Sequence, residues 1–371
     1  MRAMRSAFAR SAVTSTDRKL IPGALLALVL ALSSVAVTAN GFVDPLDQPA
    51  RSVLQAAHKP LRDIVNTGKR LIAVGDNGLI IFSDDQAATW RQAQVPVSVD
   101  FNAVYFSDAQ HGWAVGHGAA ILHSSDGGET WTKQLDGRQL EAMVVDYFKG
   151  GQSGLEPARA DSYLSAILAM SRPGPGQFFM GVWFDASGRN GYAVGPFGLI
   201  VGSHDGGKTW QPCNTRIDND DLLHLTAIDE VGGRLFITGE RGHVWVLEPG
   251  TGRFSARQTG YEGTLFGLTG DQGALLAYGL RGHVFRSTDQ GQHWASVTND
   301  FNNLVVAGAA LSGQKMVLVS QSAQVAMSRD QGATFTPLDI QPPSLLSGVV
   351  GMSGDQLALV GLNGVTTLNF K

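Results

Sequence analysis

An eight-residue pattern recurs along the chain and constrains its fold more than any other feature. The clearest copy, "SSDGGETW", spans residues 124–131, and "SHDGGKTW" (203–210) and "STDQGQHW" (287–294) repeat its Ser, Asp and Trp. Weaker copies are "SDDQAATW" (83–90) and "SRDQGATF" (328–335). A catalytic group normally occurs once in a chain, whereas repetition at a regular spacing indicates a repeat architecture.

The spacing of the copies predicts a repeating unit of about 41 residues. When the last aromatic residue of each unit is aligned, the successive spacings are 41, 79, 44, 40 and 41 residues. The spacing of 79 residues corresponds to one unit plus an insert of about 38 residues after the second unit. The aligned residues are Trp90, Trp131, Trp210, Phe254, Trp294 and Phe335.

Seven apolar runs recur along the chain, and each contains a turn that usually includes Gly. Six of them lie upstream of the six aromatic positions, and the seventh lies in the corresponding place of the last unit. The first is "LIAVGDNGLIIFS" (71–83) and the last is "LALVGLNGVTTLN" (357–369). Strands that are apolar on both faces are buried on both faces, and four short strands in about 41 residues are typical of a propeller blade. We therefore predict an all-β fold: a seven-bladed β-propeller of four-stranded antiparallel blades over residues 40–371, with an insert at 136–177.

The seventh unit ends after its third strand. The segment "ARSVLQAAH" (Ala50–His58) precedes the first strand of the first unit, and we expect it to supply the missing outer strand. Such closure would join the two ends of the ring and remove an exposed sheet edge.

The repeated turn itself is predicted to be structural. Its Asp carboxylate can accept backbone N–H bonds, its Gly can adopt positive φ, and the aromatic ring can be buried between blades. This turn is the Asp-box of the BNR-type propellers, and we expect no catalytic residues in it. The structural residues are Asp85, Asp126, Asp205, Asp289, Asp330, Trp90, Trp131, Trp210 and Trp294.

The N-terminus is a separate element that predicts export. Residues 1–19 carry five basic residues and one acidic residue, and Leu20–Val37 is almost entirely apolar. Val37-Thr38-Ala39 fits a signal-peptidase site, so residues 1–39 are expected to be a signal peptide; an uncleaved anchor helix is the alternative. In both cases the rest of the chain would be exported to the periplasm, in soluble or membrane-associated form. No Cys follows the apolar run, so we do not expect a lipoprotein anchor.

Charge and cysteine content exclude some partners. The first 39 residues contain five of the 28 basic and one of the 32 acidic residues, which leaves a net charge of −8 on the remainder. An acidic domain argues against nucleic acid as a partner. The single cysteine, Cys213, cannot form an internal disulfide, so the exported domain needs a large, well-closed core.

The insert has helical rather than strand periodicity. Apolar residues recur at helical spacing in 138–148 and 160–171, and a Gly-rich bend separates the two segments. Asp161 or Ser162 is the expected cap of the second helix. The predicted helical hairpin either plugs the mouth of the channel or offers exposed apolar side chains to a partner. The candidate contacts are Tyr163, Leu164, Ile167 and Leu168.

One face of the predicted ring collects the turns between second and third strands, together with the insert. Arg241 and Arg281 occupy the same position in "GERGH" and "GLRGH", and Arg offers a planar fork for carboxylates. We take Arg241, Arg281, His117 and Glu240 as candidate partner contacts; the alternative is that the arginines only stabilise their turns.

His243 and His283 also share a position, but neighbouring sheets lie about 10 Å apart, too far for a shared metal ion.

Two blades carry a family resemblance. "HGWAVGHGAAILHSSDGGETW" (111–131) and "NGYAVGPFGLIVGSHDGGKTW" (190–210) closely resemble the photosystem II stability and assembly factor family of BNR-like propellers. The resemblance implies a non-enzymatic exported propeller, with no cofactor, that helps to build or stabilise a membrane complex. It also implies that arginines on one propeller face bind the partner, and that relatives in non-photosynthetic bacteria associate with envelope complexes such as RND-type exporters. The insert after blade two departs from the plain family pattern.

Three functional classes follow from these patterns. The leading hypothesis is a non-enzymatic scaffold that binds an integral membrane protein or complex through the face with the arginines. A glycan- or peptide-binding propeller is the second. A sialidase-like glycoside hydrolase is the third, but that class needs a general acid and a nucleophile, or converging arginines, over the channel. The expected turns of blades one, three, six and seven contain no Arg, and the sialidase "R-I-P" motif is absent.

Overall fold

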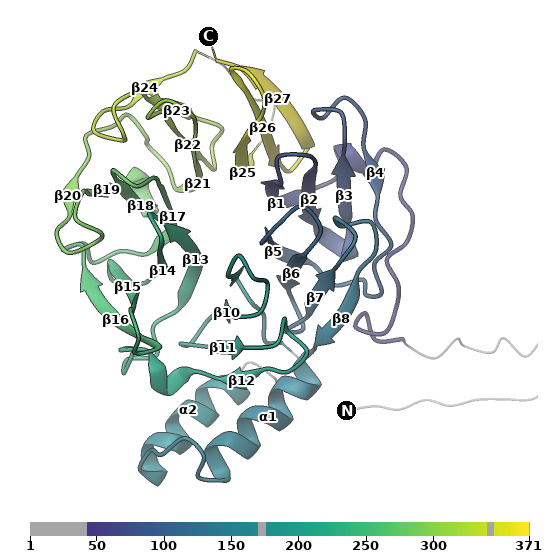
Figure 1. Ribbon diagram of the computed structural model, residues 1–371, viewed down its shortest axis with the longest axis vertical. Coiled ribbons are helices and arrows are strands. Elements are labelled where there is room, and N and C mark those ends of the chain that lie inside the picture. Colours follow the sequence, from purple (N-terminus) through teal and green to yellow (C-terminus); the bar gives the residue numbers. More distant parts are fainter. Residues whose placement is uncertain (1–42, 170–175, 340–344, 371) are drawn as a thin grey trace, which may run out of the picture. The chain divides into compact units, whose positions relative to one another are not determined.

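The repeated units fold into seven small antiparallel sheets arranged as a ring, in a computed structural model (Figure 1) that describes residues 43–169, 176–339 and 345–370. Sequential strands are neighbours in every sheet, with the first strand innermost. The strands of blades one to three are β1 (Leu61–Asn66), β2 (Leu71–Gly75), β3 (Ile80–Ser83), β4 (Arg91–Gln92), β5 (Phe101–Phe106), β6 (Gly112–Gly116), β7 (Ile121–Ser124), β8 (Thr132–Leu135), β9 (Gly181–Phe184), β10 (Gly191–Val194), β11 (Ile200–Ser203) and β12 (Gln211–Pro212).

Blades four to six repeat this order, and blade seven has its first three strands within the described residues; the prediction of a seven-bladed β-propeller is confirmed. Their strands are β13 (Leu225–Val231), β14 (Arg234–Gly239), β15 (His243–Glu248), β16 (Arg253–Gln258), β17 (Leu265–Gly270), β18 (Leu275–Gly279), β19 (Val284–Ser287), β20 (Ala295–Ser296), β21 (Val305–Ala310), β22 (Met316–Ser320), β23 (Val325–Ser328), β24 (Thr336–Pro337), β25 (Leu346–Gly351), β26 (Gln356–Gly361) and β27 (Gly364–Asn369).

The second strand of each blade forms the centre of the core. All five residues of β2, β6, β18 and β22 are buried, because each strand packs against neighbouring blades with both faces. Large aromatic rings fill the wedge between blades; Trp113 of blade two stacks on Phe184 of blade three with 3.7 Å between ring centroids. Burial of such side chains is the main favourable contribution to a fold without disulfides.

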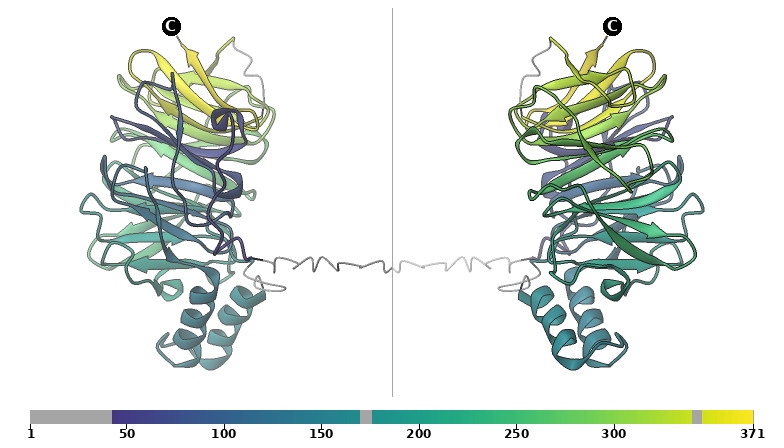
Figure 2. Two further views of the ribbon diagram at one scale, coloured as in Figure 1. Left: turned by 90° about the vertical axis from the view of Figure 1, so that its right-hand side faces the viewer. Right: turned by 90° about the vertical axis from the view of Figure 1, so that its left-hand side faces the viewer.

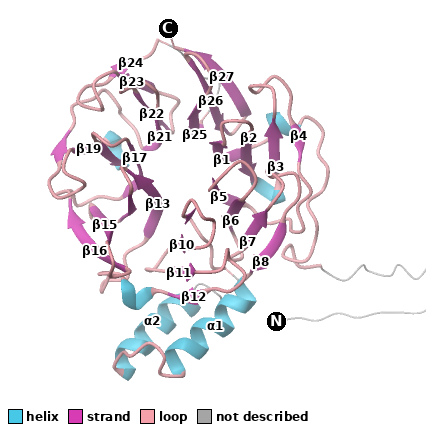
Figure 3. Ribbon diagram, viewed as in Figure 1, coloured by secondary structure: helices cyan, strands magenta, loops and turns pink. Residues whose placement is uncertain are grey.

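The insert forms two antiparallel helices, as predicted, and they are the main helical elements of the described chain (Figure 3). Helix α1 spans Gly137–Lys149 and α2 spans Pro157–Ala169. Asp136 caps α1 in a capping box with Gln139. The predicted cap at Asp161 or Ser162 is wrong, because α2 already begins at Pro157; proline suits the first helical turn, where its missing N–H has no intrahelical partner.

The hairpin stands at the rim of the ring, outside β12 and away from the channel (Figure 1). Figure 2 shows both helices extending beyond the ring when it is seen from the side. The prediction that the hairpin plugs the channel mouth is therefore wrong.

Ring closure differs from the sequence-based expectation. The sheet of blade seven contains three strands within the described residues. Ala50–His58 does not form the fourth; its last residues, Ala56–His58, adopt a single 3-10 turn that packs against β27. The ring is closed instead by contacts between β1 and β25, including a 2.8 Å hydrogen bond from the Ser347 hydroxyl to the Leu61 carbonyl.

Residues Val43–Lys59, which we call the strap, cross blade one on their way to β1. Leu46 is 2 % exposed and packs on Gly118 of blade two, and the Ala50 N–H bonds the Val95 carbonyl at 3.0 Å. The strap ends against β27, so it connects blades two, one and seven. The predicted signal segment, residues 1–39, lies outside the described residues. Among those that are described, no helix is both long and apolar enough to cross a bilayer.

Candidate partner-binding face

The two ends of the ring differ in chemistry because alternate turns point in opposite directions. The turns between second and third strands, and the links from one blade to the next, form one end, which we call the upper face. Hydrogen bonds join them: the His117 N–H bonds the Asp100 carbonyl at 2.9 Å, and the Gly242 N–H bonds the Gly263 carbonyl at 2.8 Å. The Asp-box turns form the opposite end, the Asp-box face.

The Asp-box turns are closed networks. In blade two, Asp126 accepts hydrogen bonds from the Ser124 hydroxyl (2.8 Å), the Thr130 N–H (3.0 Å) and the Thr130 hydroxyl (2.6 Å). The same pattern recurs at Asp85, Asp205 and Asp330. Donation by the backbone N–H and hydroxyl of Thr334 lowers the pKa of Asp330 to about 2. Because these oxygens are used within the turn, the geometry is that of a structural motif.

The upper face carries the exposed apolar side chains of the ring. Among the described residues, seven large apolar side chains are exposed, and those outside the strap all belong to the upper face: Phe197 (41 %), Leu280 (37 %), Leu345 (50 %) and Leu362 (54 %). Leu345 and Leu362 are adjacent, since the Leu362 N–H bonds the Leu345 carbonyl at 3.0 Å. Exposed apolar groups collected on one face indicate an interaction surface.

Aromatic and histidine rings are paired between these apolar positions. Phe197 lies against His224 with 4.6 Å between centroids, His117 stacks on Phe178 at 5.3 Å, and Tyr261 lies against His283 at 4.6 Å. Each pair joins a turn to a blade-to-blade link or to a strand start. The rings are therefore held in place, which reduces the conformational entropy that a partner would have to freeze.

The two candidate arginines lie at equivalent turn positions, but their surroundings differ. Both adopt positive φ, 51° at Arg241 and 57° at Arg281. Arg241 forms an ion pair with Asp221 at 2.9 Å, whereas Arg281 forms none with the described part of the chain. Only one of the two guanidinium groups is thus available without breaking an existing pair, and their role as partner contacts stays a prediction.

Glu240 and His117 serve the local structure as well. The Glu240 carboxylate accepts the His224 N–H at 2.8 Å and so ties its turn to the link from blade three. His117 is exposed and forms an isolated bridge with Phe178, where the chain returns from the hairpin. Both residues are on the upper face, as the topology predicts, and their contact with a partner stays a prediction.

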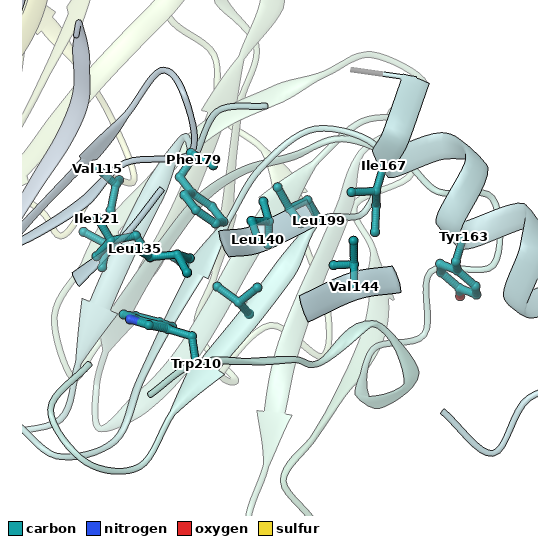
Figure 4. Close-up of a cluster of buried hydrophobic side chains, with 14 of the residues drawn as sticks. Val115, Ile121, Leu135, Leu140, Val144, Tyr163, Ile167, Phe179, Leu199 and Trp210 are labelled. Atoms are coloured by element: carbon teal, nitrogen blue, oxygen red, sulfur yellow. The ribbon is translucent and has the colours of Figure 1, made fainter. Parts of the chain in front are cut away.

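The helical candidates are not surface residues. Tyr163, Leu164 and Ile167 are 5 %, 4 % and 0 % exposed, and Leu168 is half-buried. They join Leu140 and Val144 of α1 in a cluster that extends to blade two and blade three (Figure 4). The prediction that these side chains are exposed to a partner is wrong, because the apolar face of each helix is already used against its neighbour and the ring.

Sequence reasoning missed Arg62, which lies at the mouth of the channel. This side chain contacts Asp76 (2.7 Å), Asp100 (2.9 Å) and Asn102 (2.8 Å), and so joins blades one and two. The expectation that the top of blade one carries no Arg considered only the turn between its second and third strands. The first strand of each blade also begins on the upper face, so Arg62, the second residue of "LRDIV", could have been predicted to lie there.

The channel is a cavity of about 480 Å³ lined by the innermost strands. Burial raises the pKa of Asp63 to about 6 and that of Asp229 to about 7. Asp63 accepts the Val104 N–H of the next blade at 2.9 Å and the Ile64 N–H at 2.8 Å, which is a structural link between blades. The described residues contain no cluster of three His, Cys, Asp or Glu side chains that could hold a metal ion.

Fold and repeated turns together define the chain as an Asp-box β-propeller. Residues 72–148 match the family described as "Photosynthesis system II assembly factor YCF48". A curated relative, "Photosystem II assembly lipoprotein Ycf48" of Synechococcus sp. (strain CC9902), is 27% identical over 113 residues, which are 29% of this chain and 34% of the relative. The match therefore spans about a third of that protein.

Solved structures share the architecture over most of the chain. The structure "YCF48 bound to D1 peptide" has a TM-score of 0.61 and 17% identity, and covers 87% of this chain and 99% of its own. A streptogramin B lyase structure scores 0.62 at 14% identity, with 86% and 97% covered. Likeness at such identity shows the fold alone. The sequence matches show similarity to this family over part of the chain, within a molecule that has the fold of a seven-bladed β-propeller.

Proposed function

We propose that this protein is an exported, non-enzymatic assembly or accessory factor that binds an integral membrane protein or complex through its upper face. The observation that carries the proposal is that, among the described residues of the ring, the exposed large apolar side chains are confined to that face, at Phe197, Leu280, Leu345 and Leu362. Apolar anchors surrounded by polar groups are the usual centre of a protein interface.

The relatives support a membrane-protein partner. One solved relative is described as bound to a D1 peptide, and the curated relative is by name an assembly lipoprotein. An RND-type exporter, the other partner that the resemblance implies, receives no support from these relatives and is left out of the proposal.

The non-enzymatic role is supported by the hydrogen bonds and ion pairs that the charged side chains already form within the protein. The Asp-box carboxylates are saturated by their own turns, and Arg62 is paired with two carboxylates. Asp63 holds two backbone N–H groups. A carboxylate whose oxygens already accept several hydrogen bonds within the fold has little acceptor capacity left for a substrate.

A site-specific crosslinking experiment tests the proposed face. A photoreactive phenylalanine analogue would replace Phe197 or Leu362 on the upper face, and Lys208 or Arg329 on the Asp-box face as matched exposed controls. Illumination in intact cells of the source organism should attach an integral membrane protein to the first two variants and not to the controls.

The same face should be sensitive to polar substitution. The double variant Leu345→Ser with Leu362→Ser should abolish the crosslink from position 197 while the protein keeps its melting temperature, because both side chains are exposed. Crosslinks that arise from Lys208 or Arg329 instead would show that the partner binds the Asp-box face.

A further inference from the structure

The channel is lined by small residues at the level of Asp63. Asp63 pairs with Val74 of the second strand of its blade, and the equivalent first-strand residues of other blades pair with the matching residues of their own second strands. Those equivalents that line the cavity are all Gly or Ala: Ala103, Gly181, Ala227, Gly267 and Ala307. Side chains of this size leave a cavity of about 480 Å³, which is large enough for a small organic molecule.

Two polar residues lie side by side one level closer to the Asp-box face. Asp229 of blade four pairs with Phe236, and Thr269 of blade five pairs with Leu276, so the two hold equivalent positions in neighbouring blades. Both line the channel. One oxygen of the Asp229 carboxylate accepts the Glu230 N–H at 2.8 Å. Its second oxygen accepts no hydrogen bond from any residue that the structure describes, so it is an open acceptor.

Thr269 provides a second open group, independent of the carboxylates. This residue is only 6 % exposed, and its hydroxyl forms no hydrogen bond within the described ranges of the chain. Buried hydroxyl groups are normally hydrogen-bonded. A buried hydroxyl without a protein partner, on the wall of a cavity, is available to a molecule inside that cavity.

The charges in the channel are not balanced. Among the described residues that line it, the charged side chains are Arg62, Asp63, Asp229 and Glu230. The one basic group, Arg62, already pairs with Asp76 and Asp100 at the upper mouth. Buried charges are normally paired, so a cation beside Asp229 would supply the missing partner.

The ionisation of Asp229 agrees with a missing partner. Burial, followed by the charges of Asp63 and Glu230, raises the pKa of Asp229 to about 7. Both oxygens of Asp63 already accept backbone N–H groups, from Ile64 and Val104. Asp63 therefore adds negative charge to the site, whereas Asp229 retains an oxygen for a ligand.

We propose that the channel binds the ammonium group of a small aliphatic amine between Asp229 and Thr269. The ammonium would donate to the second oxygen of Asp229 and to the Thr269 hydroxyl, and its alkyl chain would lie along Val182, Val306 and Val349, which line the same cavity. A divalent metal ion suits the site less well, because the described residues offer no cluster of three ligating side chains. This site lies inside the ring and does not depend on the proposed function of the upper face.

Isothermal titration calorimetry with the full chain tests the proposal. The probe is 1,4-diaminobutane, and the control is 1,4-butanediol, which has the same chain length but no charge. At pH 8 the amine is protonated, as a lysine side chain is, and the diamine should bind about tenfold or more tightly than the diol, because hydrogen bonds to a charged group are the stronger ones. Equal binding of the two compounds, or no binding of the diamine at the highest soluble concentration, would overturn the proposal.

Proton release gives a second reading of the same titration. At pH 7 the bound ammonium should favour ionised Asp229, so binding should release protons to the buffer. Titrations in two buffers of different ionisation enthalpy measure that release. The other titratable groups in the channel are Asp63, Glu230, Tyr105 and Tyr278, and only a release that disappears in Asp229→Asn belongs to Asp229.

Variants place the binding in the channel. Asp229→Asn and Thr269→Val keep the shape of their side chains, and each should weaken diamine binding about tenfold. Glu262→Gln, an exposed carboxylate outside the channel, is the matched control and should leave it unchanged. Thermal melting shows that each variant is folded. Unchanged affinity in Asp229→Asn, or displacement of the diamine by an equal concentration of magnesium chloride, would overturn the proposal.

Discussion

Aspartate side chains lie at two kinds of place in this protein, the Asp-box turns and the channel, and their charge is favoured in the first and disfavoured in the second. In the Asp-box they are ionised acceptors that hold a turn, and Asp126 alone accepts from two backbone N–H groups and two hydroxyls. In the channel, burial disfavours the charge of Asp63 and Asp229. All of these residues are aspartates. The ionised form is favoured where several hydrogen-bond donors surround the carboxylate, and the protonated form is favoured where burial removes more hydration than the donors replace.

The first prediction concerns the Asp-box. Asp126→Ala should lower the free energy of unfolding by about 1–3 kcal/mol, because the turn N–H groups lose their acceptor. Equilibrium denaturation in urea measures the change, and Lys208→Ala, in the equivalent turn of blade three, is an exposed control that should have little effect. An unchanged stability combined with loss of partner binding would contradict the structural role.

The second prediction concerns pH and Asp229. Its pKa is raised to about 7, first by burial and then by the charges of Asp63 and Glu230. Between the ordinary aspartate pKa of 3.8 and about 7 the folded state binds more protons than the unfolded state, so this group lowers stability as pH rises through that range. Asp229→Asn keeps the acceptor for the Glu230 N–H (2.8 Å) and removes the charge.

Asp229→Asn should therefore raise the free energy of unfolding by about 1–2 kcal/mol at pH 8, a value reduced for the partial exposure of the side chain, and change it little at pH 4.5. Urea denaturation of both proteins at the two pH values measures the difference. A stabilisation of equal size at both values would show that the charge of Asp229 is not responsible.

At the scale of elements, the helical hairpin illustrates how a correct secondary structure can be given the wrong role. The apolar spacing in 138–148 and 160–171 predicts helices correctly, but it does not say what the apolar face packs against. In the structure Leu140, Val144 and Ile167 are fully buried between α1, α2 and the two adjoining blades. The hairpin is therefore part of the core rather than an apolar anchor for a partner.

The third prediction follows from that packing. Leu140→Ala should lower the free energy of unfolding by about 2–5 kcal/mol, because a fully buried side chain leaves a cavity. Glu141→Ala, the exposed neighbour on the same helix, should change it by less than about 0.5 kcal/mol. Equal melting temperatures for the two variants would mean that the hairpin is detached from the ring in solution.

At the scale of the whole molecule, the ring is closed by packing of β1 on β25 and by the strap. Strap residues contact blades two, one and seven; Lys133 donates to the Leu46 carbonyl at 2.7 Å, and Asp47 forms an ion pair with Arg138 at 2.7 Å. A segment that joins three blades restrains the place where the ring begins and ends. Its loss should weaken the whole ring rather than one blade.

The fourth prediction tests the strap by two truncations. A chain that begins at Val43 should keep the stability of the full chain, whereas one that begins at Lys59 should lose about 2–4 kcal/mol, because Leu46 and the cover of β27 are removed. Thermal melting and size-exclusion chromatography measure stability and association. A monomeric shorter chain with an unchanged melting temperature would contradict this role.

The sequence by itself determined the architecture of this protein, because its determinants are local. A period near 41 residues, strands apolar on both faces, and a turn whose Ser, Asp and Thr bond one another specify a blade without reference to any other blade. The sequence also placed Arg241 and Arg281 at equivalent positions on one face, since alternation of turns follows from strand order alone.

Only the tertiary structure decided which apolar residues are exposed and how the ring closes. Leu164 and Leu362 are both leucines in apolar segments, yet the first is 4 % exposed and the second 54 %, because a neighbouring helix and the ring cover one and nothing in the described chain covers the other. Likewise Ala50–His58 could pair as a strand by composition, but its bonds to Gln92 and its packing on Gly364 hold it beside β27. Exposure and closure depend on contacts between segments far apart in sequence, and no local pattern specifies those contacts.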